Sequence, residues 1–348
     1  MRTHAVLSAC ATFALLACTS ENGPTEPGAS GTMAAADAPM AGAVNVWRER
    51  DPHRFGTVIG AAVGVLANPA GQSVVYGFGG CDVVQASGAH CTVSGVSIYS
   101  PATETWSFDN APEAAVWKSN GVGAIGGKLY LSGGLTTHDP ADGLTRRVWA
   151  YDPVARQATR LSDMPKATAE GVTGVIDGKL YVLPGICDAN RYPQPGYCKQ
   201  EPFRRLSRYD PVRNKWGARR SAPHFHRSGA AGVIGGKLYV VGGFRGAQSV
   251  ADLDVYDPAT DSWTTRAPMP TAGGAIGTAL EGKLYVVAGT NAYVYDPGTN
   301  KWKSIAKPAS GHDGVVRVVI NGKAKLLAIG GLGGPNFDQP SNTEVYTP

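Results

Sequence analysis

Short apolar stretches recur along this chain at similar spacing, and each of them ends in small residues. They are Tyr76–Gly80, Tyr130–Gly134, Tyr181–Gly185, Tyr239–Gly243, Tyr285–Gly289 and Leu326–Gly331. A Gly-Lys pair precedes five of the six, and a stretch rich in small residues, such as Gly229–Ile234, comes before that pair. Apolar runs of this length, bounded by glycine turns, predict β-strands rather than helices. We therefore expect an all-β fold built from hairpins.

A second phrase follows each apolar stretch: a tyrosine, a proline two residues on, and an aromatic slot seven residues on. The five full copies begin at Tyr99, Tyr151, Tyr209, Tyr256 and Tyr295. The slot holds tryptophan in four copies and Ala158 in the fifth, while a sixth copy, Tyr346–Pro348, stops at the chain end. A unit repeated about every 40–50 residues indicates a solenoid or a propeller.

The order of these phrases resembles the kelch repeat: small-residue strand, glycine turn, apolar strand, loop, Tyr-Asp-Pro strand and tryptophan strand. Six registered copies cover nearly all of residues 44–348. The resemblance implies that each unit is one four-stranded blade and that the fold is a six-bladed kelch β-propeller. In such a blade the Tyr and Trp rings pack between neighbouring blades. We therefore interpret four tryptophans as packing residues, not as a row that stacks a ligand: Trp106, Trp216, Trp263 and Trp302.

The sixth unit lacks its outer strand, because the sequence ends at Pro348. Near the start, Val44–Trp47 is a strand-like stretch with a tryptophan that has no place in the first unit. Pairing this N-terminal strand with the last blade removes an exposed sheet edge. We expect the N-terminal strand to close the ring in this way.

The first 43 residues differ in composition from the repeats. The apolar run Ala5–Ala17 is too short to cross a membrane as a helix. It ends in Leu15–Cys18, and residues 1–17 resemble a bacterial lipoprotein signal, which implies cleavage before Cys18 and lipid on that residue. An ordinary secretory signal cut elsewhere is the alternative. Residues 18–43, rich in Gly, Pro, Ala, Ser and Thr, predict a flexible tether.

These features predict an exported protein of the bacterial cell envelope, periplasmic or surface-facing. We expect it to contact the membrane only through the N-terminal lipid.

Four of the six cysteines lie in the repeats, in two loops that follow equivalent glycine positions. Of the three pairings that four cysteines allow, we predict the two local ones, Cys81–Cys91 and Cys187–Cys198. Each closes a loop of about ten residues and is worth roughly 2–3 kcal/mol. A metal site is the alternative, but two separate loops give poor ligand geometry, so we predict neither a metal ion nor another cofactor.

Charge changes this picture little. The formal net charge is +5, but five lysines occupy the repeated glycine turn. They are expected to be spread around one rim, so we predict no nucleic-acid surface. One local excess exists at Arg204, Arg205, Arg208, Arg213, Lys215, Arg219 and Arg220. We interpret it as a solvated outer-strand face, with a polyanion site as the alternative.

Function is expected in the loops, because one fold can carry many unrelated activities. The connections between second and third strands range from 6 to 24 residues, counted from the last glycine to the next repeated tyrosine. They share a face with the connections that join one blade to the next. Those blade-to-blade connections carry the polar residues Arg54, Asn120, Glu170, His224, His226, Arg227, His312 and Asp313. We predict that these residues form a binding site at the mouth of the central channel.

Two kinds of chemistry are conceivable at this mouth. His224 and His226, two residues apart, point the same way in an extended segment, and with His312 they would offer three metal ligands. The three histidines lack a ligand spacing signature, so we do not favour a metal. Glu170 and Arg227 would suit an acid and its electrostatic partner. The sequence holds no nucleophile motif and no phosphate loop.

Three functions compete on this evidence. We favour a monomeric binding or scaffold module that recognises a protein or a glycan through its variable loops. The alternative is a sugar-acting enzyme that resembles the six-bladed kelch sialic-acid epimerases. A galactose-oxidase-like copper enzyme is least favoured, because every cysteine of the mature chain already has another assignment.

Overall fold

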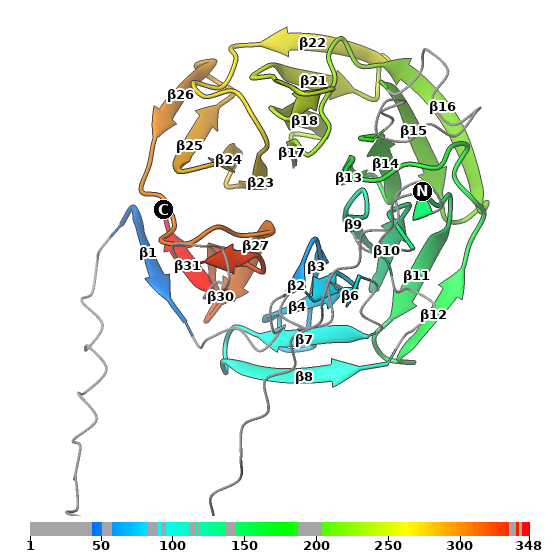
Figure 1. The fold of residues 1–348 in the computed structure, drawn as a ribbon, viewed down its shortest axis with the longest axis vertical. Helices are drawn as coiled ribbons and strands as arrows, with labels where there is room; N and C mark the ends of the chain where they lie inside the picture. Colours follow the sequence, from blue (N-terminus) through cyan, green and yellow to red (C-terminus); the bar gives the residue numbers. More distant parts are fainter. Residues whose placement is uncertain are drawn as a thin grey trace, which may run out of the picture. The chain divides into compact units, whose positions relative to one another are not determined.

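The structure is a computed structural model, and it describes residues 44–50, 58–82, 90–91, 95–110, 116, 118–136, 143–186, 204–333, 339–340 and 343–348. These residues belong to one compact unit, Ala43–Pro348. Within them, no helix has the length and apolar character needed to cross a bilayer. They form β-strands arranged as a ring around a central axis (Figure 1).

Six four-stranded antiparallel sheets form the blades of the ring, and we number the blades in chain order. Blades 1 to 3 are, from the inside outwards, β3 (Ala62–Ala67), β4 (Ser73–Phe78), β7 (Val96–Ser100) and β8 (Thr105–Asp109); β9 (Val122–Ile125), β10 (Lys128–Ser132), β11 (Val148–Asp152) and β12 (Gln157–Arg160); and β13 (Val172–Ile176), β14 (Lys179–Leu183), β15 (Arg205–Asp210) and β16 (Lys215–Ser221).

Blades 4 to 6 follow the same order, and the last one takes its outer strand from the start of the chain. They are β17 (Ala230–Ile234), β18 (Lys237–Val241), β21 (Leu253–Asp257) and β22 (Ser262–Arg266); β23 (Ile276–Leu280), β24 (Lys283–Ala288), β25 (Asn291–Asp296) and β26 (Lys301–Ser304); and β27 (Gly314–Ile320), β28 (Lys323–Ile329), β31 (Glu344–Thr347) and β1 (Val46–Glu49). The predicted six-bladed all-β propeller is confirmed.

Short strands decorate the connections between second and third strands and, in blade 1, also the segment just before the first strand. Blade 1 has β2 (Val58–Ile59), β5 (Cys81–Asp82) and β6 (His90–Cys91), blade 4 has β19 (Phe244–Arg245) and β20 (Gln248–Ser249), and blade 6 has β29 (Leu332–Gly333) and β30 (Gln339–Pro340). These additions differ from blade to blade, and they lie on the face that carries the variable loops. We call that side the cavity face.

The ring closes through pairing of the two ends of the propeller. β1 runs antiparallel to β31 with Trp47 opposite Tyr346, and the two rings lie 5.1 Å apart between centroids. The Asn45 Oδ1 atom accepts hydrogen bonds from the Tyr346 hydroxyl at 2.9 Å and from the Ala306 amide at 2.8 Å. The predicted closure by the N-terminal strand is confirmed.

Neighbouring blades meet at outer seams with a repeated set of contacts. The indole N–H of an outer-strand tryptophan donates to a carbonyl of the preceding blade: Trp216 to Ser162, Trp263 to Arg220 and Trp302 to Ala267, each at 2.9 Å, and Trp47 to Ala306 at 2.8 Å. The repeated tyrosine donates to an Asn or Asp just before the outer strand: Tyr209 to Asn214, Tyr256 to Asp261 and Tyr295 to Asn300, each at 2.7 Å, and Tyr346 to Asn45 at 2.9 Å.

The four acceptor residues at these seams have φ between 48° and 58°. Asn and Asp tolerate this left-handed region better than most side chains. Each seam therefore gives the buried aromatic body of a tyrosine or tryptophan a partner for its polar tip. This supports the interpretation of the repeated tryptophans as packing residues.

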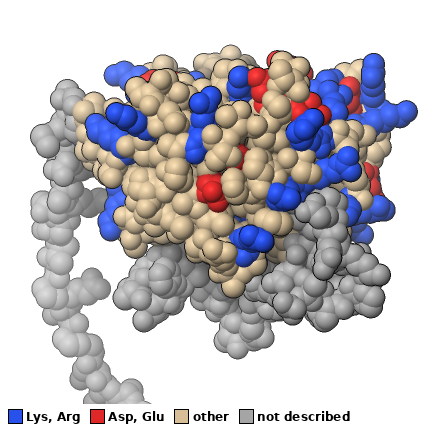
Figure 2. All heavy atoms as spheres, turned by 90° about the horizontal axis from the view of Figure 1, so that it is seen from above, with Lys and Arg blue, Asp and Glu red and all other residues tan. Residues whose placement is uncertain are grey.

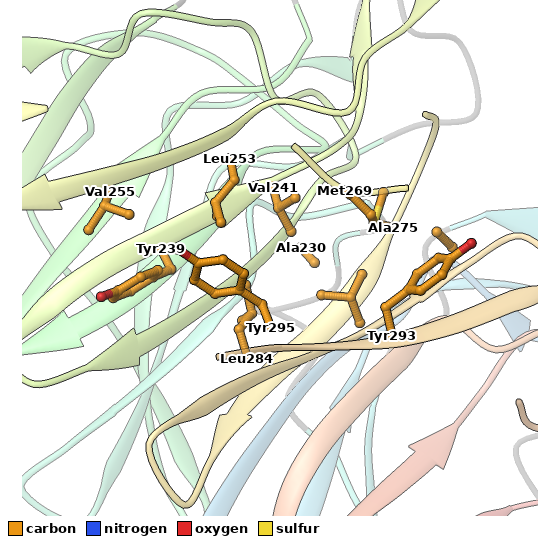
Figure 3. Packing of buried hydrophobic residues seen from close by; sticks show 12 residues of the cluster. Ala230, Tyr239, Val241, Leu253, Val255, Met269, Ala275, Leu284, Tyr293 and Tyr295 are labelled. Atoms are coloured by element: carbon orange, nitrogen blue, oxygen red, sulfur yellow. The ribbon is translucent and has the colours of Figure 1, made fainter. Parts of the chain in front are cut away.

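Packing between blades also explains the small residues of the innermost strands. A Cβ atom on Gly232 would lie 2.8 Å from Leu284 Cδ1 of the next blade, and one on Gly174 would lie 2.6 Å from Leu238 Cδ1. A leucine of each following blade thus fills the space that the glycine leaves. Figure 3 shows this packing between blades 4 and 5, where Leu284 lies beside Tyr295 in a buried cluster.

On the opposite side, which we call the turn face, the repeated glycine-turn lysines have partners that the sequence interpretation missed. Four of the five form an ion pair with the aspartate of a Tyr-Asp-Pro turn: Lys128–Asp152 at 3.1 Å, Lys179–Asp210 at 2.9 Å, Lys237–Asp257 at 2.8 Å and Lys283–Asp296 at 3.3 Å. These pairs are solvent-accessible, so each contributes little to stability. They repeat with the blades and are part of the architecture.

Candidate functional site

A central cavity of about 930 Å³ opens within the ring, and every blade contributes the entry of its first strand to the wall. The residues that line it include Gly60, Lys118, Glu170, Ser228 and Asp313. Its size falls in the range typical of sites for small molecules or inserted side chains, about 300–1,000 Å³. Four of the eight predicted site residues therefore border this cavity: Asn120, Glu170, His312 and Asp313.

Backbone hydrogen bonds link the blades around this cavity into a collar. Lys118 N donates to Gly60 O at 2.8 Å, Glu170 N to Lys118 O at 2.9 Å, Ser228 N to Glu170 O at 2.7 Å and Ala275 N to Ser228 O at 3.0 Å. Three of these residues, Lys118, Glu170 and Ser228, have φ between 50° and 55°. Non-glycine residues keep such a conformation only where the surroundings hold it. The collar therefore fixes the backbone positions from which these three side chains project.

Asp313 joins blade 6 to blade 1 with its side chain. Its Oδ2 atom accepts the Gly60 amide at 2.8 Å, the residue whose carbonyl starts the backbone chain of the collar. Burial raises the pKa of Asp313 to about 6, while bonds from the amides of Gly60, Ala61 and Gly331 act in the opposite direction. Asp313 is thus a structural part of the collar as well as a wall residue.

Glu170 is the centre of a polar cluster on the collar. Its carboxylate accepts Lys118 Nζ at 2.7 Å and Ser228 Oγ at 3.2 Å, and it lies 3.7 Å from Arg227 Nε. The Glu170 side chain is 11% exposed, so its interactions are partly shielded from bulk water. The Glu170–Arg227 pair proposed from the sequence is brought together. We call Lys118, Glu170, Arg227 and Ser228 the collar cluster.

Sequence reasoning missed Lys118 and Ser228. Glu170 and Ser228 each stand directly before a glycine, Gly171 and Gly229, and that shared position was the available signal. Lys118 stands three residues before its glycine, so a residue count alone does not align it with the other two. Only the bonds between blades reveal the equivalence.

Arg227 connects the collar cluster to the cavity-face loop of blade 4. Its guanidinium carbon lies 5.2 Å from the centre of the Phe244 ring, and its carbonyl accepts the Phe244 amide at 2.9 Å. The side chain is 17% exposed. Arg227 is thus held by a carboxylate on one side and an aromatic ring on the other, next to the cavity wall.

Asn120 has a structural role instead of the predicted ligand contact. It is buried, with 1% of its surface exposed. Its amide nitrogen donates to Ser132 O at 3.0 Å and to Thr168 O at 3.2 Å, and its Oδ1 accepts the Gly171 amide at 3.0 Å. These bonds tie blade 2 to blade 3 and occupy both ends of the amide. The expectation that Asn120 contacts a ligand is therefore corrected.

The two closely spaced histidines converge on a buried aspartate. His226 is completely buried and lies 3.2 Å from Asp254 Oδ2 through Nε2 and 3.0 Å from Gly242 O through Nδ1. His224 Nδ1 lies 3.1 Å from the same carboxylate. Burial opposes ionisation of Asp254, yet the hydrogen bond from His226 and those from Thr265 and His224 lower its pKa. Neither histidine lines the central cavity, which corrects the expectation that they form its mouth.

His312 is bonded to a different carboxylate. Its Nε2 atom lies 2.9 Å from Glu344 Oε1, and Glu344 also accepts the amides of Ala309 and Ser310. The three histidines are therefore not brought together. Among the residues that the structure describes, no group of three His, Cys, Asp or Glu side chains is arranged to hold a metal ion.

Some predicted residues lie outside the described part of the chain: Cys18, Arg54, Cys187 and Cys198. For the other cysteine pair, the backbones of Cys81 and Cys91 face each other in the ladder between β5 and β6. Both disulfides stay predictions.

Comparisons with known proteins agree with this architecture. The model of the Kelch motif matches residues 227–270, which include all four main strands of blade 4. The solved "Structure of YjhT" superposes with a TM-score of 0.61 at 17% identity, over 84% of this chain and 95% of that one. At this identity the likeness concerns the fold alone.

Three curated relatives are similar in sequence. Kelch-like protein 35 of Mus musculus is 26% identical over 64% of this chain, Kelch-like protein terF of Aspergillus terreus is 28% identical over 67%, and Kelch-like protein 23 of Homo sapiens is 27% identical over 66%. The alignments span only 36%, 55% and 40% of those relatives, respectively.

Proposed function

Because this chain is a kelch-repeat β-propeller, we propose that it is a protein-binding module whose partner docks on the cavity face. The observation that carries the proposal is the collar cluster, an unrepeated set of polar side chains beside the central cavity. The residues that maintain the ring recur from blade to blade, whereas the members of this cluster differ. Binding residues on variable loops above a rigid frame are a common use of such a scaffold.

The collar cluster is preorganised for contact. Arg227 is held between Glu170 and Phe244, so its guanidinium loses less freedom when it binds than a mobile arginine would. Arginine and aromatic side chains are also enriched among the residues that dominate protein interfaces. The exposed Arg245, in the β19–β20 hairpin, extends the same surface outwards.

We favour a protein over a glycan as the ligand, because an arginine held against an aromatic ring is typical of protein interfaces. The kelch-like relatives do not decide this point. Their names identify the repeat and give no partner, and this chain spans about half or less of their length, so no partner is transferred from them. The sugar-acting alternative has no observation in its favour over binding, and we do not propose it.

Site-specific photo-crosslinking tests the choice of face. A benzoylphenylalanine residue is placed at Gln248, in the cavity-face hairpin, or at Thr299, in a turn on the opposite face; both positions are exposed. In extracts of the source cells we expect one discrete adduct from position 248 and none from position 299. An adduct from position 299 alone would contradict the proposal.

We also propose that the protein is exported and anchored by lipid on Cys18. The apolar run that ends in Leu15–Cys18 and the tether-like composition of residues 18–43 support this. A single acyl chain gives only marginal anchoring, so a stable anchor requires more than one. Cell fractionation should find the protein in membranes and the Cys18→Ala variant in the soluble fraction after a salt wash; a variant that stays membrane-bound would refute the anchor.

A further inference from the structure

A second cavity, of about 440 Å³, lies beside the outer strands of blade 2 and shares no lining residue with the central cavity. Its walls are the segment Leu144–Arg147 that enters β11, the end of β12 at Arg160, and part of the connection to blade 3. We call it the blade 2 cavity. None of its residues belongs to the repeated phrases or to the collar cluster.

The lining of the blade 2 cavity is strongly basic. Among the described residues that line it are Arg146, Arg147, Arg160 and Lys166, together with one carboxylate, Asp163. Asp163 binds Arg160 and has its Oδ2 atom 3.7 Å from Arg146 Nη2. One carboxylate therefore orients two of the guanidinium groups.

Packing and backbone bonds hold these walls in place. The guanidinium of Arg160 lies over the Trp149 ring, 5.4 Å from its centroid. The Met164 amide donates to Arg146 O at 2.9 Å, which joins the two walls of the cavity. Arginines that are stacked and ion-paired lose less freedom on binding than mobile side chains do.

The surrounding region adds to the positive potential. Residues 118–222 contain 17 Lys and Arg against nine Asp and Glu, so they carry +8, whereas the remainder of the chain carries −3. In Figure 2, Lys and Arg are denser towards the right-hand side, where Figure 1 places β15 and β16. A positive field of this kind raises the local concentration of anions near a cleft that is itself lined by positive charges.

We propose that the blade 2 cavity binds a multiply charged oxyanion, as a phosphate or sulfate group of a small soluble ligand. Guanidinium groups match the geometry of these oxyanions with paired N–H donors. A volume of about 440 Å³ accommodates a compact ligand rather than a macromolecular surface. The blade 2 cavity shares no lining residue with the central cavity, and this proposal does not depend on the protein-binding one.

Isothermal titration with inorganic pyrophosphate tests the proposal, on the full chain with Cys18→Ala so that no lipid contributes, at about 0.15 M salt. We expect saturable binding that weakens by about tenfold or more in Arg146→Gln/Arg147→Gln. The matched control is Arg219→Gln/Arg220→Gln, which removes the same charge from the outer strand of blade 3 and should change the affinity by less than about twofold. Thermal unfolding of each variant verifies that it is folded.

Three results would overturn the proposal: no saturable binding by the parent chain, equal losses in both double variants, or binding to a lipid surface alone. The last is measured by co-sedimentation with phosphatidylcholine vesicles with and without phosphatidylglycerol. Binding to the anionic vesicles without binding of pyrophosphate would assign the cavity to a lipid headgroup and refute a soluble ligand.

Discussion

The outer seams and the collar join the same six blades by different means. Four seams use a tryptophan that donates to a carbonyl of the preceding blade. In each, an Asn or Asp also accepts both the tyrosine hydroxyl of its own blade and an amide of the preceding blade. The collar uses backbone bonds through residues that differ in every blade, among them Lys118, Glu170 and Ser228. At the blade 6–blade 1 junction, a carboxylate from Asp313 takes part instead.

This difference separates architecture from function. A contact that recurs in blade after blade is explained by the need to join blades, and it requires no ligand. The collar joins blades mostly through main-chain atoms, and its side chains form an unrepeated polar cluster beside the cavity. We therefore expect changes at the seams to alter stability and changes in the collar cluster to alter binding.

The largest effect is expected when a seam loses its strand. Deletion through Trp47 removes Asn45 and the first half of β1, leaves part of the β31 edge unpaired and breaks the bonds to Ala306 and Tyr346. It should cost at least about 4 kcal/mol, because it removes a packed tryptophan together with the first half of the β1–β31 ladder. Deletion through Ala41 is the control and should leave denaturant unfolding unchanged. Equal midpoints for both truncations would contradict the closure.

A single side chain should have a smaller effect at a regular seam. Trp263→Ala removes ring packing against Tyr256 and the bond to Arg220 O. The indole is only partly buried, so we expect about 2–3 kcal/mol of destabilisation in urea unfolding. Trp263→Phe keeps part of the packing and should cost about 1 kcal/mol. Neither variant should change the affinity for the partner. A folded seam variant that no longer bound the partner would contradict the separation of stability at the seams from binding at the collar cluster.

Asp313 gives the junction of blades 6 and 1 a distinctive dependence on pH. Burial raises the pKa of its carboxyl from 3.8 to about 6. Between those values the folded state binds more protons than the unfolded state, so the free energy of unfolding falls as the pH rises. Between about pH 4 and pH 6, the free energy of unfolding of the wild-type protein should fall by roughly 2 kcal/mol relative to that of Asp313→Asn. Urea unfolding across this range measures the difference, and a constant difference would show that Asp313 does not titrate there.

The sequence predicted the ring because the repeat is local. Three features are each recognisable from a few consecutive residues: the Tyr-Asp-Pro phrase, the glycine turn and the unpartnered strand at Val44–Trp47. Together they predict the number of blades and how the ring closes. The role of Asn45 at the last seam was not predicted, because its equivalence to Asn214 depends on pairing across about 300 residues.

The candidate site was predicted less well, because its contacts cross between blades or lie far apart in the chain. His226 was assigned to the cavity mouth because it lies in a blade-to-blade connection, and nothing local indicates that Asp254 contacts both His224 and His226. Lys118 was missed because its partner, Glu170, is 52 residues away. Loop length and the absence of a repeat pattern indicated the region around Glu170 and Arg227, where binding stays a prediction, but not which polar groups face one another.

The most direct test of the account is an affinity measurement with the partner that the crosslinking identifies. Surface plasmon resonance compares the collar variant Glu170→Gln/Arg227→Gln with the turn-face variant Lys237→Ala/Lys283→Ala, after thermal unfolding shows both to be folded. The account predicts a dissociation constant raised more than about tenfold, or about 1.4 kcal/mol, in the collar variant, and a change of less than about twofold in the turn-face variant. Normal binding by the collar variant with loss in the turn-face variant would contradict it.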